Sequence, residues 1–538
     1  MKNIINGEKS RKKIFSGIKK VAKTVICTMG PKGRNVILDK GNESPLITND
    51  GVTIAREITL EDKFENMGAG MVKQAAEKTN TLAGDGTTTA TLLTYAIAKE
   101  GQKYLKQGVN AVELKNGLLK ARDLICEELE KNTKQIKSSQ EIEQVATISA
   151  QDSEVGGIIA DAMEKVGNTG VISIEEGQTF GLEVSITQGM EFDQGYISPY
   201  MISDSEKMLS IMDNSPILIT DQKISQTAQL LPILEKLVSE GIKDLVILAE
   251  DVENDALTAI VLNKIKGSLN ILAIKNPGFG EGKNDFIKDI AILTGTNIIT
   301  SELGMKLENI ELSDLGKAKT IISSKNRTTI IGGLGDKKEI EERIEELKQA
   351  IDIIDDGINK DLFLERLAKL DSGVALIKVG AASEIEMKEK KLRIEDALNS
   401  TRAAIEEGVV AGGGIALLKA SQILEGISFG NSDQDLAIKI LKKALIYPTK
   451  QILKNAGKDY KNILSQIIEN SNINFGYNAA TDNFEDMIQS GIIDPKKVER
   501  IALEQAISLS AMFLTTEAAI SIPKRQTFKL PDVSGMNF

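Results

Sequence analysis

The sequence predicts a multidomain α+β protein in which an α/β block is inserted into a mainly helical body. A chain of 538 residues is too long for one hydrophobic core, and roughly three or four domains are expected at that length. In the middle third, amphipathic helical segments alternate with strand-like apolar runs at 217–219, 245–249 and 271–274. That alternation is typical of a largely parallel sheet. Both flanking segments have helical patterns, so the chain crosses twice between the two bodies.

The N-terminal segment predicts an amphipathic helix of the folded body, because Ile14, Ile18, Val21 and Val25 recur at helical spacing. This basic segment lacks the apolar core of about 7–15 residues that a secretory signal requires. No apolar stretch of the sequence approaches the roughly 20 residues needed to cross a bilayer.

A β-hairpin and two helices are predicted next. Residues 36–38 and 46–48 are short β-rich runs separated by a segment of turn-forming composition. Helical patterns rich in alanine and leucine cover residues 64–83 and 87–108, and the glycines of the intervening segment 84–86 are expected to end the first helix.

Residues 336–371 predict a packed helical hairpin, since the apolar spacing sustains only about two heptads of a coiled coil. Gly189 and the pair Ser372-Gly373 stand at the edges of the inserted block and are consistent with hinges, although ordinary loop glycines are the default interpretation. The spacing that defines the hairpin is carried by Ile340, Ile344, Leu347, Ile351 and Ile354.

Composition excludes several classes of function. The net charge of −11 argues against nucleic acid or an anionic membrane as the main partner. Histidine is absent, so no Ser-His-Asp or Cys-His nucleophile and no histidine-ligated zinc site exists. Carboxylates and hydroxyls remain, and these suit magnesium. Cys27 and Cys126 have no metal or redox spacing, and two reduced thiols favour a cytoplasmic protein.

Four glycine-rich or acidic segments stand out, at 28–33, 49–51, 84–89 and 412–414, and none is a Walker A loop or a complete G-x-G-x-x-G. In the third segment, Gly86 permits a tight turn and Thr87 to Thr89 open a helix, which together resemble a phosphate cradle. Asp85 beside it could hold magnesium. Ordinary helix capping by the threonines is the favoured interpretation of this segment taken alone.

Two further patterns gain meaning only from context. On the predicted helix 386–407, Asp396 lies off the apolar stripe and could face a cleft, but a lone carboxylate is usually solvated surface. In the middle block, two helical segments carry apolar faces whose default interpretation is burial against the sheet. These faces comprise Leu230, Leu231, Leu234, Leu237 and Val238 on the first segment, and Leu257, Ile260, Val261 and Ile265 on the second.

Seven ordered blocks are similar to those of one family, the group I chaperonins of the GroEL type, and the resemblance extends from about Lys2 to Lys529. It implies an equatorial ATPase domain formed from 1–131 and 408–538, an intermediate hinge domain from 132–188 and 374–407, and an apical client- and lid-binding domain at 189–373. The blocks are 28–36, 60–68, 83–91, 195–200, 387–391, 403–414 and 475–481.

The resemblance implies an ATP-dependent folding chamber of two stacked seven-membered rings, which binds unfolded polypeptides and is closed by a co-chaperonin. Asp50 and Asp396 would orient the attacking water, and Asp85 would hold Mg²⁺. K⁺ would lie near Thr28, the carbonyl of Asn49, and Thr88. The triphosphate would contact Thr28, Met29, Gly30, Pro31, Asp85, Gly86, Thr87, Thr88 and Thr89, and the nucleoside would contact Gly413, Asn478, Ala479, Ala480 and Asp494.

The resemblance also implies an exposed client and lid surface in place of core packing. Departures from the family pattern include Met201 for Phe, Asn49 for Lys, Gln194 for Arg and Ser372 for Gly, and the chain ends at 534–538 without a Gly-Gly-Met tail. The expected surface consists of Tyr196, Tyr200, Met201, Leu231, Leu234, Leu257, Val261 and Leu262.

Two rival functions remain open. A non-hydrolysing oligomeric scaffold with the same fold is disfavoured by intact Asp50, Asp85 and Asp396, and ATP turnover separates the two. A group II chaperonin needs a built-in lid, and the apical segment of this sequence contains no insertion long enough to form one.

Overall fold

The structure is a computed structural model that describes residues 3–41, 45–136, 138–167, 170–177, 181–205, 207–277, 282–353, 358–371 and 373–522. The chain forms two compact units. Unit 1 combines Met1–Ala160, Thr179–Gly181 and Val379–Phe538, and unit 2 combines Asp161–Gln178 with Leu182–Lys378. The insertion inferred from the sequence is thus present, because unit 1 contains both ends of the chain. Ser372, Ile354 and residues 534–538 lie outside the described residues.

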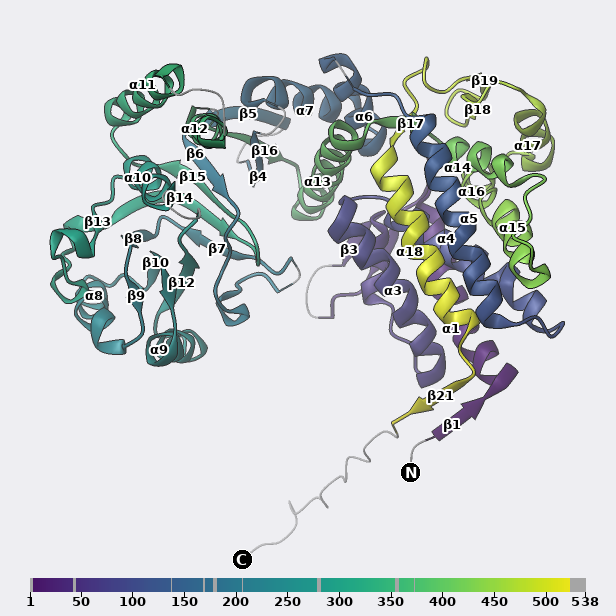
Figure 1. Ribbon diagram of the computed structural model, residues 1–538, viewed down its shortest axis with the longest axis horizontal. Coiled ribbons are helices and arrows are strands. Elements are labelled where there is room, and N and C mark those ends of the chain that lie inside the picture. Colours follow the sequence, from purple (N-terminus) through teal and green to yellow (C-terminus); the bar gives the residue numbers. More distant parts are fainter. Residues whose placement is uncertain are drawn as a thin grey trace, which may run out of the picture. The chain divides into compact units, whose positions relative to one another are not determined.

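Unit 1 is a bundle of long helices whose apolar faces meet in one core (Figure 1). The first helix buries Ile14, Ile18, Val21 and Val25, as their spacing predicts. It packs closely on α3 because both helices place a glycine at the contact: a Cβ on Gly17 would lie 1.8 Å from the Glu65 carbonyl oxygen. The bundle comprises α1 (Gly7–Val25), α3 (Lys63–Ala83), α4 (Thr87–Leu105), α5 (Ala111–Lys131), α15 (Ser432–Ala444) and α18 (Lys496–Leu514).

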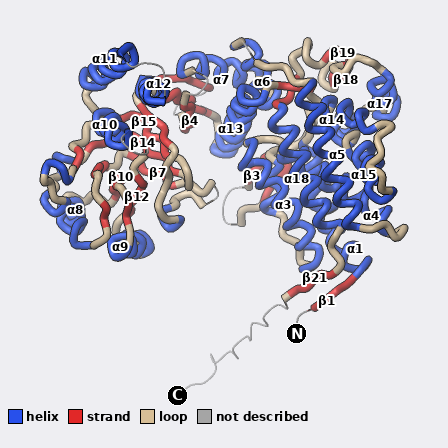
Figure 2. The backbone as a smooth tube through the Cα atoms, in the orientation of Figure 1, coloured by secondary structure: helices blue, strands red, loops and turns tan. Residues whose placement is uncertain are grey.

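Four strand pairs and further helices complete the described part of unit 1 (Figure 2). Four antiparallel strand pairs are β1 (Asn3–Asn6) with β21 (Ala518–Ser521), β2 (Val36–Leu38) with β3 (Leu46–Thr48), β17 (Val409–Ala411) with β20 (Ile493–Pro495), and β18 (Phe475–Asn478) with β19 (Asn483–Asp486). The predicted hairpin at 36–48 is therefore confirmed. The remaining helices are α2 (Gly51–Glu57), α6 (Ser139–Ala150), α13 (Glu384–Glu407), α14 (Ile415–Ala420), α16 (Tyr447–Asn455) and α17 (Tyr460–Glu469), while α7 (Ser153–Val166) extends beyond unit 1.

Unit 2 is built on a mixed sheet of eight strands among its described residues, and helices cover this sheet. The three predicted apolar runs form adjacent parallel strands β8, β10 and β12, and β13 also pairs parallel with β8. The expectation of a largely parallel sheet is wrong for the other half, because the short turn from β14 to β15 makes an antiparallel hairpin. The strands are β6 (Gly189–Phe192), β7 (Ser210–Asp213), β8 (Pro216–Thr220), β10 (Asp244–Ala249), β12 (Asn270–Lys275), β13 (Ile298–Ile299), β14 (Gly316–Ser323) and β15 (Thr328–Gly333).

The predicted helical hairpin is present in unit 2 as α11 (Lys337–Ile353) and α12 (Ile358–Asp371), which pack on the core beside α10 (Gly282–Thr294). The fully buried Asp289 of α10 accepts two hydrogen bonds from Arg366 of α12, at 2.7 and 3.0 Å, and one from Arg343 of α11 at 2.9 Å. Charge-assisted pairing of this geometry fixes both helices of the hairpin to α10.

Small sheets and two further helices complete the described fold. A three-stranded sheet has the order β4 (Val171–Glu176), β16 (Val374–Gly380), β5 (Gly181–Thr187), and β9 (Lys223–Ile224) pairs parallel with β11 (Asp251–Val252). Helices α8 (Thr227–Ser239) and α9 (Asn254–Ile265) connect strands of unit 2. No helix in the described ranges combines the length and apolar character that crossing a membrane requires.

Candidate functional site

A cavity of about 670 Å³ in unit 1 brings together segments from both halves of the chain. Every residue that the sequence analysis assigned to nucleotide or metal lines this one cavity. They are Thr28, Met29, Gly30, Pro31, Asn49, Asp50, Asp85, Gly86, Thr87, Thr88, Thr89, Asp396, Gly413, Asn478, Ala479, Ala480 and Asp494.

The turn between α3 and α4 forms one wall of the cavity. Gly84 ends α3 and Gly86 is the N-cap of α4, and both adopt left-handed φ values of 72° and 80°. Gly86 has no side chain with which to cap the helix, so the first N–H groups of α4 and the positive end of its dipole are available to an anion. Capping by the threonines, the alternative that the segment alone favoured, is therefore wrong, because they lie inside the helix.

Asp50 enters the same wall as the N-cap of α2. Its carboxylate accepts hydrogen bonds from the backbone N–H groups of Val52 and Thr53, at 3.1 and 3.0 Å, and from the Thr53 hydroxyl at 2.5 Å. The next residue, Gly51, permits a close approach to α4, since a Cβ there would lie 2.5 Å from Thr88 Oγ1. Asp50 thus has a structural role in addition to any role toward a ligand.

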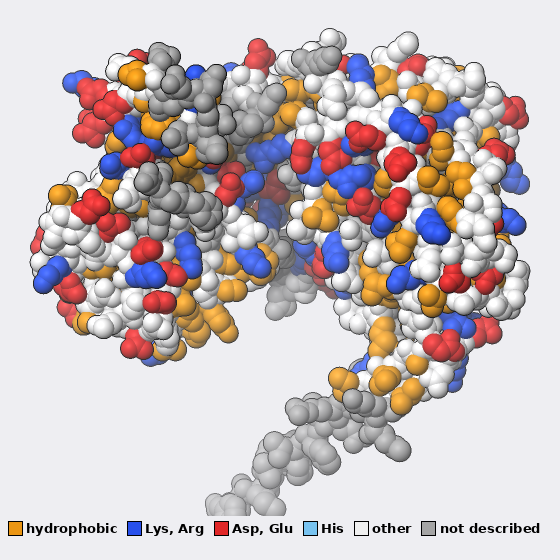
Figure 3. Space-filling view, in the orientation of Figure 1, with side chains coloured by type: hydrophobic (Ala, Val, Ile, Leu, Met, Phe, Trp, Pro, Cys, Tyr) orange, Lys and Arg blue, Asp and Glu red, His pale blue; other side chains and the backbone are white. Residues whose placement is uncertain are grey.

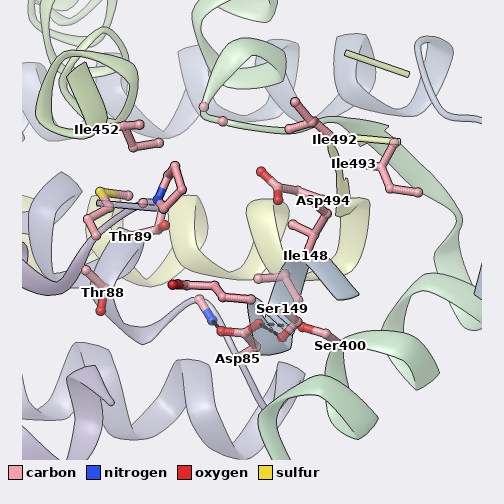
Figure 4. Close-up of a pocket in the computed structure, with 18 of the residues that line it drawn as sticks. Asp85, Thr88, Thr89, Ile148, Ser149, Ser400, Ile452, Ile492, Ile493 and Asp494 are labelled. Carbon is pink, nitrogen blue, oxygen red and sulfur yellow. Dashed lines mark hydrogen bonds between the residues drawn. The ribbon is translucent and has the colours of Figure 1, made fainter. Parts of the chain in front are cut away.

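Asp85, like Asp50, accepts three hydrogen bonds at the cavity. Its Oδ1 accepts from the backbone N–H of Gly86 at 2.5 Å, and its Oδ2 accepts from the hydroxyls of Ser149, at 3.1 Å, and Ser400 (Figure 4). Burial raises the pKa of Asp85, and these three hydrogen bonds oppose that rise. The negative charge of Asp50 raises the pKa of Asp85 further, so the two carboxylates of the cavity interact electrostatically.

A second acidic pair lines the cavity where β20 leads into α18. Burial and the charge of Asp85 raise the pKa of Asp494 to about 6, and the neighbouring Glu499 carboxyl lies within hydrogen-bonding contact. Glu499 is only 5% exposed, its pKa is raised well above the ordinary value by burial, and its Oε2 has no hydrogen-bond partner among the described atoms. Glu499 could not be recognised as a cavity residue from the sequence, because an acid in the first turn of a helix is an ordinary pattern.

Asp396 reaches the cavity from α13, whose observed bounds confirm the predicted helix 386–407. Ile394, Leu398 and Thr401 are buried as the predicted apolar stripe requires. Ser400 follows Asp396 by one helical turn, so both side chains lie on the same face of α13. Ser400 and Ser149 could not be recognised as cavity residues from the sequence, since a serine within a helix carries no signal of its own.

The side of the cavity away from Asp85 is mainly apolar, although the Asp494 carboxylate also lies there (Figure 4). Ile452, Ile492 and Ile493 lie on this side. Gly413 and Gly414 also line the cavity and have φ values of 70° and 76°. A Cβ on Gly414 would lie 2.8 Å from Pro448 Cβ, so this turn requires glycine. The cavity therefore combines an apolar side, suited to a flat ring, with a polar side, suited to phosphate groups.

The donor set of the polar side fits a hard cation. Asp85 and Asp50 supply carboxylate oxygens, Thr28 and Thr88 supply hydroxyls, and Asn49 supplies a carbonyl, while histidine is absent from the chain. No cluster of three or more acids, cysteines or histidines with metal-binding geometry occurs in the described ranges. A Mg²⁺ ion here would need ligands from water or phosphate, which is how this ion is usually bound.

Unit 2 contains a separate apolar groove of about 400 Å³ between α8 and α9. On the face drawn in Figure 3, apolar side chains gather at the lower edge of this unit, beside α9. Of the expected client surface, Tyr200, Leu231 and Leu262 are exposed by 65%, 49% and 48%. Leu257 and Val261 are half-buried, and three members are buried, namely Tyr196, Met201 and Leu234.

The default interpretation of the apolar faces of α8 and α9, burial against the sheet, is correct for one face of each helix. Leu230 and Leu237 of α8 and Ile260 of α9 are buried in the core of unit 2, whereas Val238 and Ile265 are exposed. Each helix thus has an apolar face in the core and further apolar residues at the surface. Such an apolar surface on a globular unit marks a site of interaction.

Comparisons with known proteins identify the class. The chain is 21% identical to the chaperonin gp146 from the bacteriophage EL 2 (Pseudomonas aeruginosa), whose crystal structure was determined in the presence of ATP-BeFx; the match has a TM-score of 0.66 and covers 97% of this chain and 99% of that one. The two proteins therefore share the chaperonin fold. The sequence model of the TCP-1/cpn60 chaperonin family matches residues 21–523, and the chain belongs to this family. As a member, it is an ATP-dependent chaperonin, which confirms the class and the multidomain α+β fold that the resemblance implied.

Proposed function

We propose that the chain is a group I chaperonin subunit that binds and hydrolyses ATP in the unit 1 cavity and uses this cycle to bind, enclose and release unfolded polypeptides. The observation that carries the proposal is the convergence of the α4 N-terminus with Asp50, Asp85 and Asp396 in one cavity. The domain division 1–131, 132–188, 189–373, 374–407 and 408–538 is part of this proposal, as is a cytoplasmic location.

The polar side of the cavity supplies the groups that phosphoryl transfer requires. The N–H groups of Thr87, Thr88 and Thr89 and the backbone of 28–31 bind the triphosphate, since free helix-start donors favour anions. Asp85 holds Mg²⁺, which when bound neutralises phosphate charge. The Asp50 and Asp396 carboxylates accept hydrogen bonds from the attacking water and orient it, and K⁺ lies near Thr28, Asn49 and Thr88. Hydrolysis then depends mainly on positioning and charge stabilisation.

The apolar side of the cavity holds the nucleoside. Ala479 and Ala480 with Gly413 leave room for a flat ring, and Asn478 and Asp494 offer polar contacts to the sugar. Because Asp396 stands on α13, which belongs to the proposed hinge domain, its approach to the nucleotide depends on the seating of that helix. Hydrolysis is thereby tied to conformation.

The apolar groove of unit 2, which Leu231 lines, and the exposed side chains of Leu262 and Tyr200 outside it bind the client. They offer non-directional apolar burial, which needs no sequence code in the client. A separate co-chaperonin lid binds the same surface, so that lid and client compete and the client is released into the chamber. The assembly is two stacked seven-membered rings.

The test is refolding of a chemically denatured protein by the purified chain in four conditions: no nucleotide, ATP, ATP with a co-chaperonin, and ATP with excess EDTA. Phosphate release is measured in parallel. We expect client capture without nucleotide, productive release only with ATP, and loss of turnover in EDTA. Client capture with no ATP turnover under any condition would instead establish the non-hydrolysing scaffold.

A further inference from the structure

Asp85 receives hydroxyl donors from two helices that lie outside the turn in which it stands. The Ser149 hydroxyl of α6 donates a hydrogen bond to Asp85 Oδ2 at 3.1 Å, and the Ser400 hydroxyl of α13 donates to the same oxygen (Figure 4). Ser400 is fully buried. A single carboxylate oxygen therefore joins three segments of unit 1: 84–86, α6 and α13.

The contact made by Ser400 is not the one that a buried helical serine or threonine usually makes. Such hydroxyls commonly donate to the carbonyl one turn earlier on their own helix. Thr401, the next residue, does this, with Thr401 Oγ1 2.7 Å from the Ala397 carbonyl oxygen. Ser400 instead donates away from α13 to Asp85. Ser400 and Thr401 are thus both buried and both on α13, but the hydroxyl of Ser400 donates to another segment and that of Thr401 donates within its own helix.

The hydrogen bonds restrict how Asp85 can serve a cation. A carboxylate has about four lone-pair sites, two on each oxygen. The two serine hydroxyls occupy both sites of Oδ2, and the Gly86 N–H occupies one site of Oδ1. One site on Oδ1 remains, so Asp85 in this arrangement can offer one oxygen to a cation while keeping all three donors.

We propose that Ser400 is a positioning residue that holds Asp85 for coordination of Mg²⁺ through Oδ1 alone. The inference rests on the proposed function, because it assumes that Asp85 is the magnesium ligand. Hydrogen-bonded partners of a ligating carboxylate fix its orientation, and losing one typically weakens metal affinity about 10–100-fold. Through its hydrogen bond to Asp85, Ser400 also connects α13 to the cation site. Asp396 stands one turn earlier on the same helix, so its position is connected to that site as well.

The experiment compares Ser400→Ala with Thr401→Val in the full chain. Thr401→Val removes a buried hydroxyl from the adjacent position of α13, but one that bonds only its own helix. Binding of the nonhydrolysable analogue AMP-PNP is measured by calorimetry in excess EDTA and then across a Mg²⁺ titration. For Ser400→Ala we expect unchanged affinity in EDTA and a midpoint Mg²⁺ concentration raised about 10–100-fold. For Thr401→Val we expect both quantities to match the wild-type protein.

A second variant guards against a folding defect. Ser400→Cys keeps the size of the side chain but offers only a weak donor, and its Mg²⁺ midpoint should shift in the same direction. Wild-type Mg²⁺ dependence in both Ser400 variants would overturn the inference while leaving the proposed function intact. If Mg²⁺ does not strengthen AMP-PNP binding even in the wild-type chain, the proposed role of Asp85 fails. The Ser400 effect should also vanish in an Asp85→Asn background, and its persistence there would overturn the inference.

Discussion

The cavity of unit 1 and the groove of unit 2 are built in opposite ways. The cavity gathers residues from segments spread from Thr28 to Glu499, and burial raises the pKa values of three of its acids, Asp85, Asp494 and Glu499. The groove is formed mainly by two helices that are close in sequence, and eight of its twelve lining residues are aliphatic. Chemistry on a phosphate needs fixed positions, whereas capture of unfolded chains needs only apolar area. Substitutions should therefore have sharp, position-specific effects in the cavity and graded effects in the groove.

The largest effect is expected for Asp396→Ala in the cavity. Loss of the carboxylate that we propose orients the attacking water should lower the ATP hydrolysis rate by about 10²–10⁴-fold. Nucleotide affinity and client capture should be retained, because the phosphate-binding N-terminus of α4 and the groove of unit 2 are unaltered. The measurement is single-turnover phosphate release alongside equilibrium nucleotide binding.

Glu406→Ala provides the matched control for Asp396. Glu406 also stands on α13, but its side chain is exposed and pairs with Lys497 outside the cavity. Its removal should leave hydrolysis within a few-fold of the wild-type rate. If both variants hydrolyse ATP at the wild-type rate, the role proposed for Asp396 is lost, and the cavity would be no more position-specific than the groove.

Neighbouring leucines of α8 test the groove. Leu230 is buried in the core, so Leu230→Ser should lower the free energy of unfolding by about 2–4 kcal/mol. Leu231 is half exposed, so Leu231→Ser should leave stability nearly unchanged and weaken capture of an unfolded client by about 1 kcal/mol, or several-fold. Urea denaturation and client titration separate the two. Equal destabilisation by both substitutions would show that the groove is core rather than binding surface.

Much of the architecture could be predicted from the sequence because it depends on local pattern. Helical spacing located α1, α13 and the pair α11–α12, and glycines located the break between α3 and α4. The antiparallel pairing of β14 and β15 was not predicted, because the apolar pattern of a strand does not by itself give the pairing direction. That direction follows instead from the short connection at 324–327, which only antiparallel strands allow.

The cavity was predicted only as far as its motifs extend. Residues in glycine-rich or acidic segments, such as Asp85 and Gly413, could be named, and they do converge. Ser149, Ser400 and Glu499 could not, because their position depends on how α6, α13 and α18 pack around the turn at 84–86. For the expected client surface, the resemblance identified Met201 and Leu231 alike, but only packing decides that the first is buried and the second exposed.

A smaller effect is expected on the pH dependence of the free energy of unfolding. It should come from the buried acids of the cavity and not from the groove. The pKa values of Asp494 and Glu499 are raised above 3.8 and 4.5, so the folded state holds protons that the unfolded state has released. The contribution of Asp494 is fully present below about pH 4 and is lost as the pH rises through about 6, and that of Glu499 is lost as the pH rises through its own raised pKa. Glu499→Gln removes one of these groups, and without nucleotide it should be more stable than the wild-type chain at pH 8 by on the order of 1–3 kcal/mol.

The control for this prediction is Glu504→Gln on the same helix. Glu504 pairs with Arg500 at 3.0 Å and is partly exposed, so its substitution should not flatten the pH profile. The measurement is urea denaturation from pH 5 to pH 8, expressed as the difference between each variant and the wild-type chain. Parallel profiles for wild-type and Glu499→Gln would show that this carboxyl ionises normally and that the cavity tolerates its charge.

The smallest effect separates the two roles of Asp50. Its carboxylate caps α2 through the N–H groups of Val52 and Thr53, so Asp50→Ala should lower the free energy of unfolding by about 1 kcal/mol. Asp50→Ser restores a cap through its hydroxyl and should recover most of that loss. Neither variant has a carboxylate to orient water, so ATP hydrolysis should fall in both. Denaturation and phosphate release are measured on the same preparations. The opposite outcome is hydrolysis that is lost in Asp50→Ala and restored in Asp50→Ser, in parallel with stability. It would mean that this part of the cavity needs only a well-formed helix start. The Asp50 carboxylate would then be as replaceable as an apolar side chain in the groove.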